Sequence, residues 1–304
     1  MASIGRLVAG LLVLVAAVGP SARFSSAESL DPAYDQGLAR ARAGWVVSGT
    51  DVLARLDEHL QTVQRLDDAI PAEWKQRGFD HIGDIDVAGT TLYVPFEQSD
   101  YDQGHQAMAR YDADTLTFRD ATIVAQHENS FVTVDAGSGI AYSMDRFDGS
   151  ALLRYDVRAG WRPLASLHLD RKLTRVQGAA VARDAVWLAA DDEQHGLYRV
   201  DIDSGTVDSL GAAPPDAGEG EGIDAATISS GNLHATVVNA DRAAVTLDHF
   251  RTHGEPTAGA PASTRPDTSW PPALTYFAIA LGLAAIGAVL TVFYRARTTL
   301  RPKR

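Results

Sequence analysis

The feature that most constrains the fold is a short phrase that recurs along the chain. Residues 197–207 read LYRVDIDSGTV, a strand that passes through Asp201 into a Ser-Gly turn and a second strand. Related phrases end at four other aspartates, which are Asp57, Asp112, Asp156 and, in a weaker copy, Asp248. The spacings between the five are 55, 44, 45 and 47 residues. A period in the forties is typical of a β-propeller, in which each repeat forms one four-stranded blade.

Three further strands can be placed around each phrase. The first strands share a glycine position, occupied by Gly37, Gly83, Gly178 and Gly222, with Phe131 in its place in the third repeat. Second strands are predicted at residues 45–48, 91–94, 140–143, 185–188 and 233–238, and fourth strands at 62–66, 117–118, 164–169 and 206–210. The sequence therefore predicts an all-β propeller of five blades between about residues 34 and 250. A sixth blade, the alternative, would have to lie hidden in degenerate sequence.

The fifth repeat lacks a clear fourth strand. An open sheet edge invites pairing with other chains, so propellers often close with an N-terminal strand in the last blade. Residues 29–33 are the segment placed to do this. Residues 69–77 (AIPAEWKQR) break the strand rhythm and are expected to form a short helix or loop. We expect Asp57, Asp112, Asp156 and Asp201 to cap the turns into the fourth strands.

Both ends of the chain are predicted to lie outside the propeller. Residues 1–27 resemble a signal peptide, with Arg6, an apolar core at 7–19 and small residues at 25–27. The ectodomain is predicted at 28–251 and a Pro/Ala/Thr-rich linker at 252–270. Residues 274–293 carry no charge, which predicts a transmembrane helix within 271–294. The basic tail at 295–304 predicts a single-pass type I protein of the cell membrane, with its C-terminus in the cytoplasm and its propeller outside it.

The charge distribution narrows the partners. Residues 28–270 hold all 39 acidic residues and 20 of the 27 basic ones, an excess of 19 negative charges. So acidic a domain is a poor nucleic-acid binder, because affinity for phosphate depends on Lys and Arg. We expect no nucleic-acid partner, and a cationic ligand or basic partner suits the domain better. The chain has no cysteine, so disulfides and thiolate metal sites contribute nothing.

Two series of polar residues should converge on one face of the propeller. Loops that enter the first strands carry Gln36, His81, Asn129, Gln177 and Glu221, and loops that leave the second strands carry Ser48, Glu97, Asp145, Asp191 and Asn239. Because these loops open on the same face of a propeller, the series predicts a ligand site at the channel mouth. The alternative is that each residue bonds backbone groups at blade junctions or faces solvent.

Three local clusters carry the chemistry. HIGDID brings Asp84 and Asp86 to one strand face with His81 before them, QHENS places His127, Glu128 and Asn129 in succession, and GEGEGID sets Glu219 and Glu221 between glycines. A histidine beside a carboxylate can act as a general base, so His81, His127 and Glu128 are the catalytic candidates. Oxygen donors suit Ca²⁺, and the metal candidates are Glu97, Asp145, Asp191, Glu219 and Glu221. The ligand-binding candidates are Gln36, His81, Asp84, Asn129, Gln177 and Glu221.

These residues carry a family resemblance. At HIGDID with LYVPFE, NSFVTVD with AYSMDRF, VQGA with VWLAADD, and GEGEGID, the chain resembles secreted bacterial propellers of uncharacterised function. The phrase at residues 197–201 with its Ser-Gly turn is more distantly similar to strictosidine-synthase-like, gluconolactonase-like and YVTN-type propellers. That resemblance implies a divalent cation in the channel and hydrolysis of lactones or esters. Five blades depart from the six usual among those hydrolases.

Three functions follow as hypotheses. The first is a membrane-anchored extracytoplasmic module that binds a small molecule or a protein at an acidic channel mouth. The second is a Ca²⁺-dependent lactone or ester hydrolase with His81 or His127 as base. The third is a structural envelope module that contacts another protein through a blade flank. Neither a helical zinc-binding His-Glu-x-x-His nor a Gly-x-Ser-x-Gly nucleophile turn occurs, which favours binding over catalysis.

Overall fold

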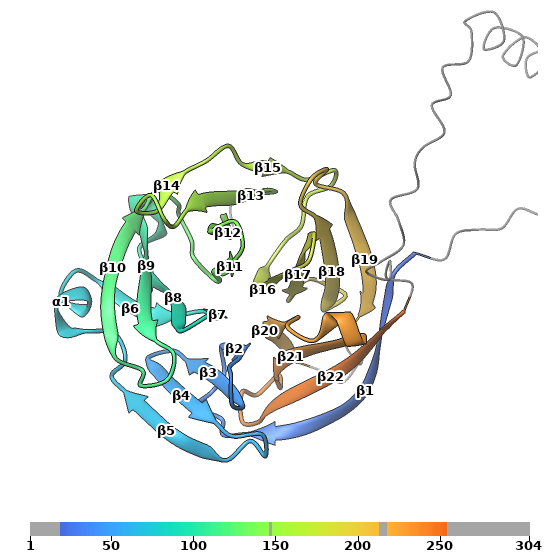
Figure 1. Ribbon diagram of the computed structural model, residues 1–304, viewed down its shortest axis with the longest axis horizontal. Coiled ribbons are helices and arrows are strands. Elements are labelled where there is room, and N and C mark those ends of the chain that lie inside the picture. Colours follow the sequence, from blue (N-terminus) through green and yellow to red (C-terminus); the bar gives the residue numbers. More distant parts are fainter. Residues whose placement is uncertain (1–18, 146–147, 213–217, 254–304) are drawn as a thin grey trace, which may run out of the picture. The chain divides into compact units, whose positions relative to one another are not determined.

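The described part of the chain forms five antiparallel sheets arranged as blades around one axis (Figure 1). The computed structural model describes residues 19–145, 148–212 and 218–253. The prediction of an all-β, five-bladed propeller is confirmed. Secondary structure outside the strands is limited, in these ranges, to α1 (Ala72–Lys75), η1 (Tyr101–Gln103) and η2 (Ile228–Ser230).

Each blade is a sheet whose innermost strand comes first in the repeat. Blade 1 holds β2 (Gly37–Arg40), β3 (Trp45–Gly49), β4 (Val52–Leu56) and β5 (Thr62–Asp67). Blade 2 holds β6 (Phe79–Ile82), β7 (Asp86–Ala88), β8 (Thr91–Gln98), β9 (Gln106–Asp112) and β10 (Phe118–Val124). Blade 3 holds β11 (Thr133–Asp135), β12 (Ile140–Asp145), β13 (Asp148–Asp156), β14 (Arg162–Pro163) and β15 (Leu167–His168). Blade 4 holds β16 (Val176–Ala182), β17 (Ala185–Ala190), β18 (Gly196–Asp201) and β19 (Val207–Ala212). Blade 5 holds β20 (Glu219–Asp224), β21 (Asn232–Val238), β22 (Val245–His253) and β1 (Ser21–Leu30).

The recurring aspartates cap turns, as the sequence predicts. Asp112 Oδ1 accepts hydrogen bonds from the backbone N–H of Asp114 at 3.1 Å and of Thr115 at 2.9 Å. Asp57, Asp156 and Asp201 accept backbone N–H groups two to four residues ahead in the same manner. The weaker copy behaves differently, because Asp248 lies inside β22 and accepts the hydroxyl of Thr246 at 2.7 Å.

The outer strands depart from prediction in blades 2 and 3. The outer strand of blade 2 runs over Phe118–Val124, well beyond the two residues expected. In blade 3 the expected strand at 164–169 is two short pieces, β14 and β15. Pro163 offers no N–H to the ladder, and the chain continues with a single bond from the N–H of Leu164 to the carbonyl of Arg154 at 2.9 Å.

Asp84 joins the blades at the axis. Its carboxylate accepts the backbone N–H of Leu38 in blade 1 at 3.0 Å, of Ala179 in blade 4 at 2.9 Å and of Ile223 in blade 5 at 3.4 Å. Its own backbone forms a parallel bridge with Phe131 of blade 3. One residue of blade 2 therefore contacts all four other blades.

This junction corrects the prediction that Asp84 and Asp86 share one face of a strand. The strand ends at Ile82 and resumes at Asp86, because the backbone of Asp84 bonds blade 3 instead of its own sheet. The N–H of Asp84 donates to the carbonyl of Ser130 at 2.7 Å, and the N–H of Val132 donates to the carbonyl of Asp84 at 3.2 Å.

The shared glycines of the first strands surround Asp84. A Cβ added to Gly37 would lie 2.5 Å from Asp84 Cα, one on Gly222 would lie 2.7 Å from Gly37 Cα, and one on Gly178 would lie 2.8 Å from Gly222 Cα. No side chain fits at such distances. We call Asp84 with Gly37, Gly83, Gly178 and Gly222 the central layer. It explains why glycine recurs at one position of the first strand.

An N-terminal strand closes the ring, but not quite where predicted. β1 pairs antiparallel with β22 from Ser21 opposite His253 to Leu30 opposite Val245. The expected segment, residues 29–33, overlaps only the end of this strand. Asp31 instead begins a turn, since its side chain accepts the N–H of Ala33 and its carbonyl accepts the N–H of Tyr34, both at 2.9 Å. Residues 21–27, assigned to the signal peptide from sequence, contribute to this strand.

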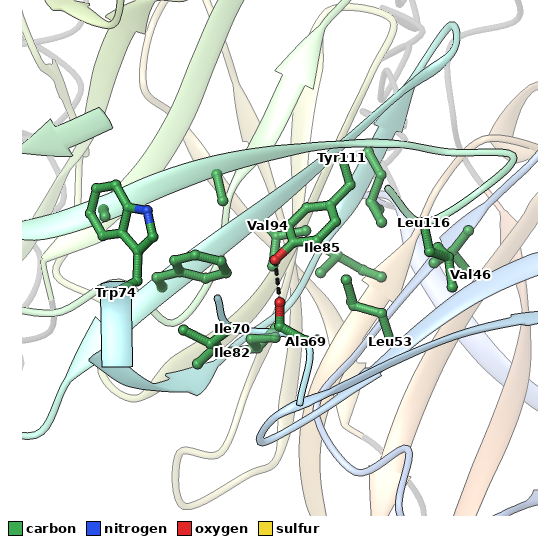
Figure 2. Packing of buried hydrophobic residues seen from close by; sticks show 14 of the residues in the cluster. Val46, Leu53, Ala69, Ile70, Trp74, Ile82, Ile85, Val94, Tyr111 and Leu116 are labelled. Atoms are coloured by element: carbon green, nitrogen blue, oxygen red, sulfur yellow. Dashed lines mark hydrogen bonds between the residues drawn. The ribbon is translucent and has the colours of Figure 1, made fainter. Parts of the chain in front are cut away.

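The hydrophobic core is divided among the junctions between blades. Five clusters of buried side chains each combine residues from two adjacent blades. Figure 2 shows the cluster between blades 1 and 2, where the hydroxyl of Tyr111 donates to the carbonyl of Ala69 at 2.5 Å and Trp74 of α1 lies at one edge. α1 confirms the helix or loop predicted at residues 69–77.

The predicted linker, membrane span and basic tail lie outside the described residues, as do residues 1–18 of the predicted signal peptide. Within the ranges that the structure describes, no helix has the length and apolarity needed to cross a membrane.

Two glycines of β20 give a matched test of the central layer. Gly222→Ala should destabilise the protein by on the order of 3 kcal/mol, because the new methyl group would collide with the backbone of blade 1. Gly220→Ala, two residues away, meets its nearest atom at 3.9 Å and should change stability by less than about 1 kcal/mol. Urea denaturation of both variants measures the difference. Equal stabilities would contradict the close approach at the axis.

Candidate functional site

One face of the propeller contains a cavity of about 510 Å³ lined by all five blades. We call it the mouth cavity. Its lining residues are Asp35, Gln36, Thr50, Asp80, His81, Gly83, Glu97, Ser99, Tyr101, Glu128, Ser130, Gln177, Glu219, Glu221 and Arg242. Nearly all are polar, and six carry a carboxyl group. The central layer lies at its base, since Gly83 belongs to both.

The structure brings many of the sequence candidates to this cavity. Those that line it are Gln36, His81, Glu97, Glu128, Gln177, Glu219 and Glu221. They come from the innermost strands or the loops beside them, and from the end of β8 in the case of Glu97. The convergence follows from the radial arrangement of the blades, which turns equivalent positions of each repeat toward one axis.

The other candidates have structural contacts elsewhere. Asp84 belongs to the central layer, and Asn129 is fully buried, with its side chain donating to the carbonyl of Ala107 at 2.8 Å. Asp145 accepts the backbone N–H of His127 at 2.9 Å, and the ring of His127 bonds the carbonyl of Tyr101. Asp191 pairs with Arg175. None of Asp84, Asn129, His127, Asp145 and Asp191 lines the mouth cavity.

Two further polar candidates support neighbouring backbone. Ser48 donates its hydroxyl to the carbonyl of Gly83 at 2.9 Å and so ties blade 1 to the central layer. Asn239 accepts the N–H of Ala244 through its side chain at 2.8 Å, while its carbonyl accepts the N–H of Arg242 at 2.8 Å. Asn239 therefore shapes the loop that carries Arg242 to the cavity.

Sequence reasoning missed Arg242, Asp35 and Asp80. Arg242 lies three residues after Asn239, in a loop where it adopts a positive φ of 54°. Its position beside a predicted loop residue was the available signal. Among the described residues that line the cavity, it is the one Arg or Lys.

Three carboxyl groups share the guanidinium of Arg242. Its Nη2 donates to Asp35 at 2.9 Å, and its Nη1 donates to Glu219 at 2.8 Å and to Glu221 at 3.4 Å. Asp35 precedes blade 1, whereas the two glutamates lie on β20 of blade 5. One positive charge thus faces three acidic groups at the junction between the first and last blades.

Burial changes the protonation of Glu221. Only 5% of this residue is exposed. Burial, with the nearby charge of Glu219 adding to it, raises the pKa of Glu221 to about 8, although Arg242 opposes the shift. At neutral pH the carboxyl group of Glu221 is therefore mostly protonated, and it can donate a proton or a hydrogen bond within the cavity.

The pKa of His81 is lowered, which favours the neutral form of its imidazole. Burial lowers the pKa of its imidazole, with the charges of Asp35 and Asp80 opposing the shift. Its Nε2 lies 3.0 Å from Oε1 of Gln36, which orients the ring across the junction of blades 1 and 2. The cavity therefore contains a neutral imidazole and a protonated carboxyl group at neutral pH.

Glu97 is held in place by the backbone of the next blade. Its Oε1 accepts the N–H of Asn129 at 2.8 Å, and it lies opposite His81 in the pairing of β6 with β8. Asn129 was predicted to bind ligand, but it is better described as a support for this carboxylate.

A second cavity of about 280 Å³ opens on the other side of the central layer. Residues that follow the layer in each first strand line it, among them Arg40, Asp86, Ala180 and Asp224. Burial raises the pKa values of Asp86 and Asp224 to about 6. Each also joins two blades, since Asp86 accepts the N–H of Val134 at 2.7 Å and Asp224 accepts that of Arg40 at 3.0 Å.

The carboxylates of the mouth cavity do not converge on a single point in the manner of a metal centre. Among the described residues, no group of three or more His, Cys, Asp or Glu side chains is arranged to hold a metal ion. The prediction of Ca²⁺ binding stays a prediction.

Comparisons with known proteins address the fold. No family model matches the sequence, and no curated protein matches it. Among solved structures, a glutaminyl cyclase of Myxococcus xanthus superposes with a TM-score of 0.58 at 14% identity, covering 78% of this chain and 99% of that one. A luciferin-regenerating enzyme gives 0.45 at 11% identity, covering 69% and 74%, and hydrazine synthase of Kuenenia stuttgartiensis gives 0.43 at 12%, covering 70% and 58%. The likeness to the glutaminyl cyclase supports a β-propeller fold and leaves the specific family open.

The pKa of Glu221 predicts how stability depends on pH. The native state holds a proton on Glu221 up to about pH 8, whereas the unfolded chain releases it near 4.5. Its contribution to stability is therefore full below pH 4.5 and is lost as pH rises through 8. Between pH 5 and pH 9, the stability of Glu221→Gln relative to the wild type should increase by about 4 kcal/mol, because the wild type loses this contribution.

Urea denaturation across this pH range measures the effect, with Glu193→Gln, an exposed glutamate outside the cavity, as the control. The control should track the wild type at every pH. A constant difference between Glu221→Gln and the wild type would show that Glu221 titrates normally.

Proposed function

We propose that the protein binds a small ligand with a positively charged nitrogen in the mouth cavity. The observation that carries this proposal is the imbalance of charge around the mouth cavity, where six carboxyl groups and one guanidinium line about 510 Å³. A cation that enters such a cavity gains electrostatic attraction from several directions.

The neutral groups of the cavity suit a ligand that also forms hydrogen bonds. The amides of Gln36 and Gln177 and the hydroxyls of Ser99, Ser130 and Tyr101 can pair with N–H, hydroxyl or amide groups of a ligand. The volume of the cavity accommodates a small molecule, such as an amino acid or a short peptide. In the cell, the membrane anchor predicted from sequence would present this cavity outside the cytoplasm.

Methylguanidinium and N-methylurea test the proposal as a matched pair, because they have nearly the same shape and differ in charge. Isothermal titration calorimetry should detect methylguanidinium binding and no methylurea binding at equal concentration. Asp80→Asn and Glu128→Gln, both in the lining, should each weaken binding about tenfold, a change of about 1.4 kcal/mol.

Asp203→Asn is the control for these variants, because Asp203 lies in an exposed turn outside the cavity. It should leave affinity unchanged. Binding should also weaken as salt concentration rises. Equal binding of the charged and the neutral probe would contradict recognition of a cation.

A second candidate is catalysis by proton transfer in the same cavity. It is favoured by His81 and Glu221, whose pKa values are shifted so that a base and an acid coexist at neutral pH. The fold is shared with a glutaminyl cyclase, whose name states that it cyclises glutaminyl residues. In such a reaction the α-amine, after losing a proton to a base, attacks the side-chain amide carbon, and the bond from that carbon to the amide nitrogen breaks so that ammonia leaves. A peptide with an N-terminal glutamine fits this reaction. That substrate carries a cationic amine at neutral pH.

The sequence resemblance to lactone and ester hydrolases offers a different reaction, with Ca²⁺ as cofactor.

Assays with and without Ca²⁺ separate the two reactions. Ammonia release from a glutamine peptide that chelator does not reduce would support cyclisation, and Ca²⁺-dependent ester or lactone hydrolysis would support the hydrolase. For either reaction, Glu221→Gln and His81→Gln should lower kcat at least about a hundredfold, as expected for general acid–base groups. No turnover in either assay would contradict this second candidate, and the calorimetric comparison of methylguanidinium with N-methylurea would then decide on cation binding alone.

A further inference from the structure

The acidic groups around Arg242 are too many for its single charge. Asp35, Glu219 and Glu221 all lie within 3.4 Å of its guanidinium, and the other cation nearby, Arg175, pairs with Asp191 and lies 3.5 Å from Glu219. Glu221 is the most buried of the three carboxyl groups, with 6% of its side chain exposed against 22% for Asp35 and 27% for Glu219.

Each element packed against Glu221 contributes one of the groups that it faces. Glu219 precedes it on β20, Arg242 comes from the loop between β21 and β22, and Asp35 comes from the segment before β2. Arg175 precedes β16, and Asp84 lies beneath in the central layer, where Gly178 and Gly222 contact it. The acidic groups of this cluster, Asp35, Glu219 and Asp191, outnumber its basic groups, Arg242 and Arg175.

We propose that Glu221 exchanges its proton for the cationic ligand, so that each ligand that enters the mouth cavity releases one proton to solvent. This inference rests on the proposed function and adds its regulation by pH. A buried carboxyl group among uncompensated carboxylates holds a proton while the cavity is empty. A cation beside it supplies the missing positive charge, and the proton then leaves as the carboxylate forms. The raised pKa of Glu221 agrees with this geometry.

Proton release has a defined signature in the pH dependence of affinity. While Glu221 is protonated in the free protein, affinity should rise about tenfold for each pH unit, and it should level off above pH 8. Between pH 6 and pH 9 the wild type should gain about thirtyfold or more in affinity. Glu221→Gln carries no exchangeable proton, so its affinity should change less than about threefold over the same range.

Methylguanidinium is the appropriate probe, because its charge is constant across this pH range. Calorimetry at pH 7 in buffers of different ionisation enthalpy counts the protons released on binding. The expected count is close to one for the full-length wild type and close to zero for Glu221→Gln. Glu193→Gln, outside the cavity, should behave as the wild type.

A measurement without ligand keeps the inference separate from the proposed function. Infrared spectra of protein with ¹³C-labelled glutamate should show a protonated carboxyl band at pH 7 that disappears as pH rises through about 8 and is missing in Glu221→Gln. Binding of methylguanidinium without proton release would overturn proton exchange and leave cation binding intact. If the probe does not bind, the proposed function and the exchange both fail, and the infrared band then shows whether Glu221 holds a proton at all.

Discussion

The carboxylate of Asp84 is the interaction on which the rest of the propeller depends. Neighbouring blades of a propeller are not joined by a continuous ladder of backbone hydrogen bonds, so the innermost strands present N–H groups to the axis. Asp84 accepts three of them, from Leu38, Ala179 and Ile223, and bonds blade 3 through its own backbone. Without it, several buried donors would lose their acceptor at once, which is far more costly than the loss of an exposed hydrogen bond.

The central layer also decides where a site can form. Because the first strands approach too closely for any Cβ at Gly37, Gly178 and Gly222, the axis is closed at this depth. The channel expected in a propeller is thereby divided into two cavities, of about 510 and 280 Å³. Residues just before the layer line the larger cavity, and residues just after it line the smaller one. The larger cavity is therefore open to solvent at one end and closed by the central layer at the other.

Closure of the ring also places acidic residues at the junction of the first and last blades. β1 completes blade 5, and the chain then turns at Asp31 to begin blade 1. This turn places Asp35 beside Glu219, Glu221 and Arg242, residues about two hundred positions away. The cluster of three carboxyl groups around Arg242 thus arises where the two ends of the repeat array meet.

The sequence by itself determined the number of blades, the turn caps at Asp57, Asp112, Asp156 and Asp201, and the glycine position of the first strands. These follow from periodicity and local hydrogen bonding, which depend on residues close together in the chain. It also identified positions that converge, and Gln36, His81, Glu97, Glu128, Gln177, Glu219 and Glu221 do line one cavity.

Only the tertiary structure decided what each convergent side chain does. His81 and Asn129 occupy equivalent positions of their repeats, yet His81 lines the mouth cavity while the side chain of Asn129 bonds the backbone of blade 2. Asp145 also bonds backbone, since it accepts the N–H of His127. Arg242 reaches the cavity through a loop conformation with positive φ, which no spacing rule contains. The physical reason is that the repeat fixes the direction of each strand. Whether a polar side chain then bonds backbone, bonds a neighbouring side chain or faces the cavity depends on contacts between blades that are distant in sequence.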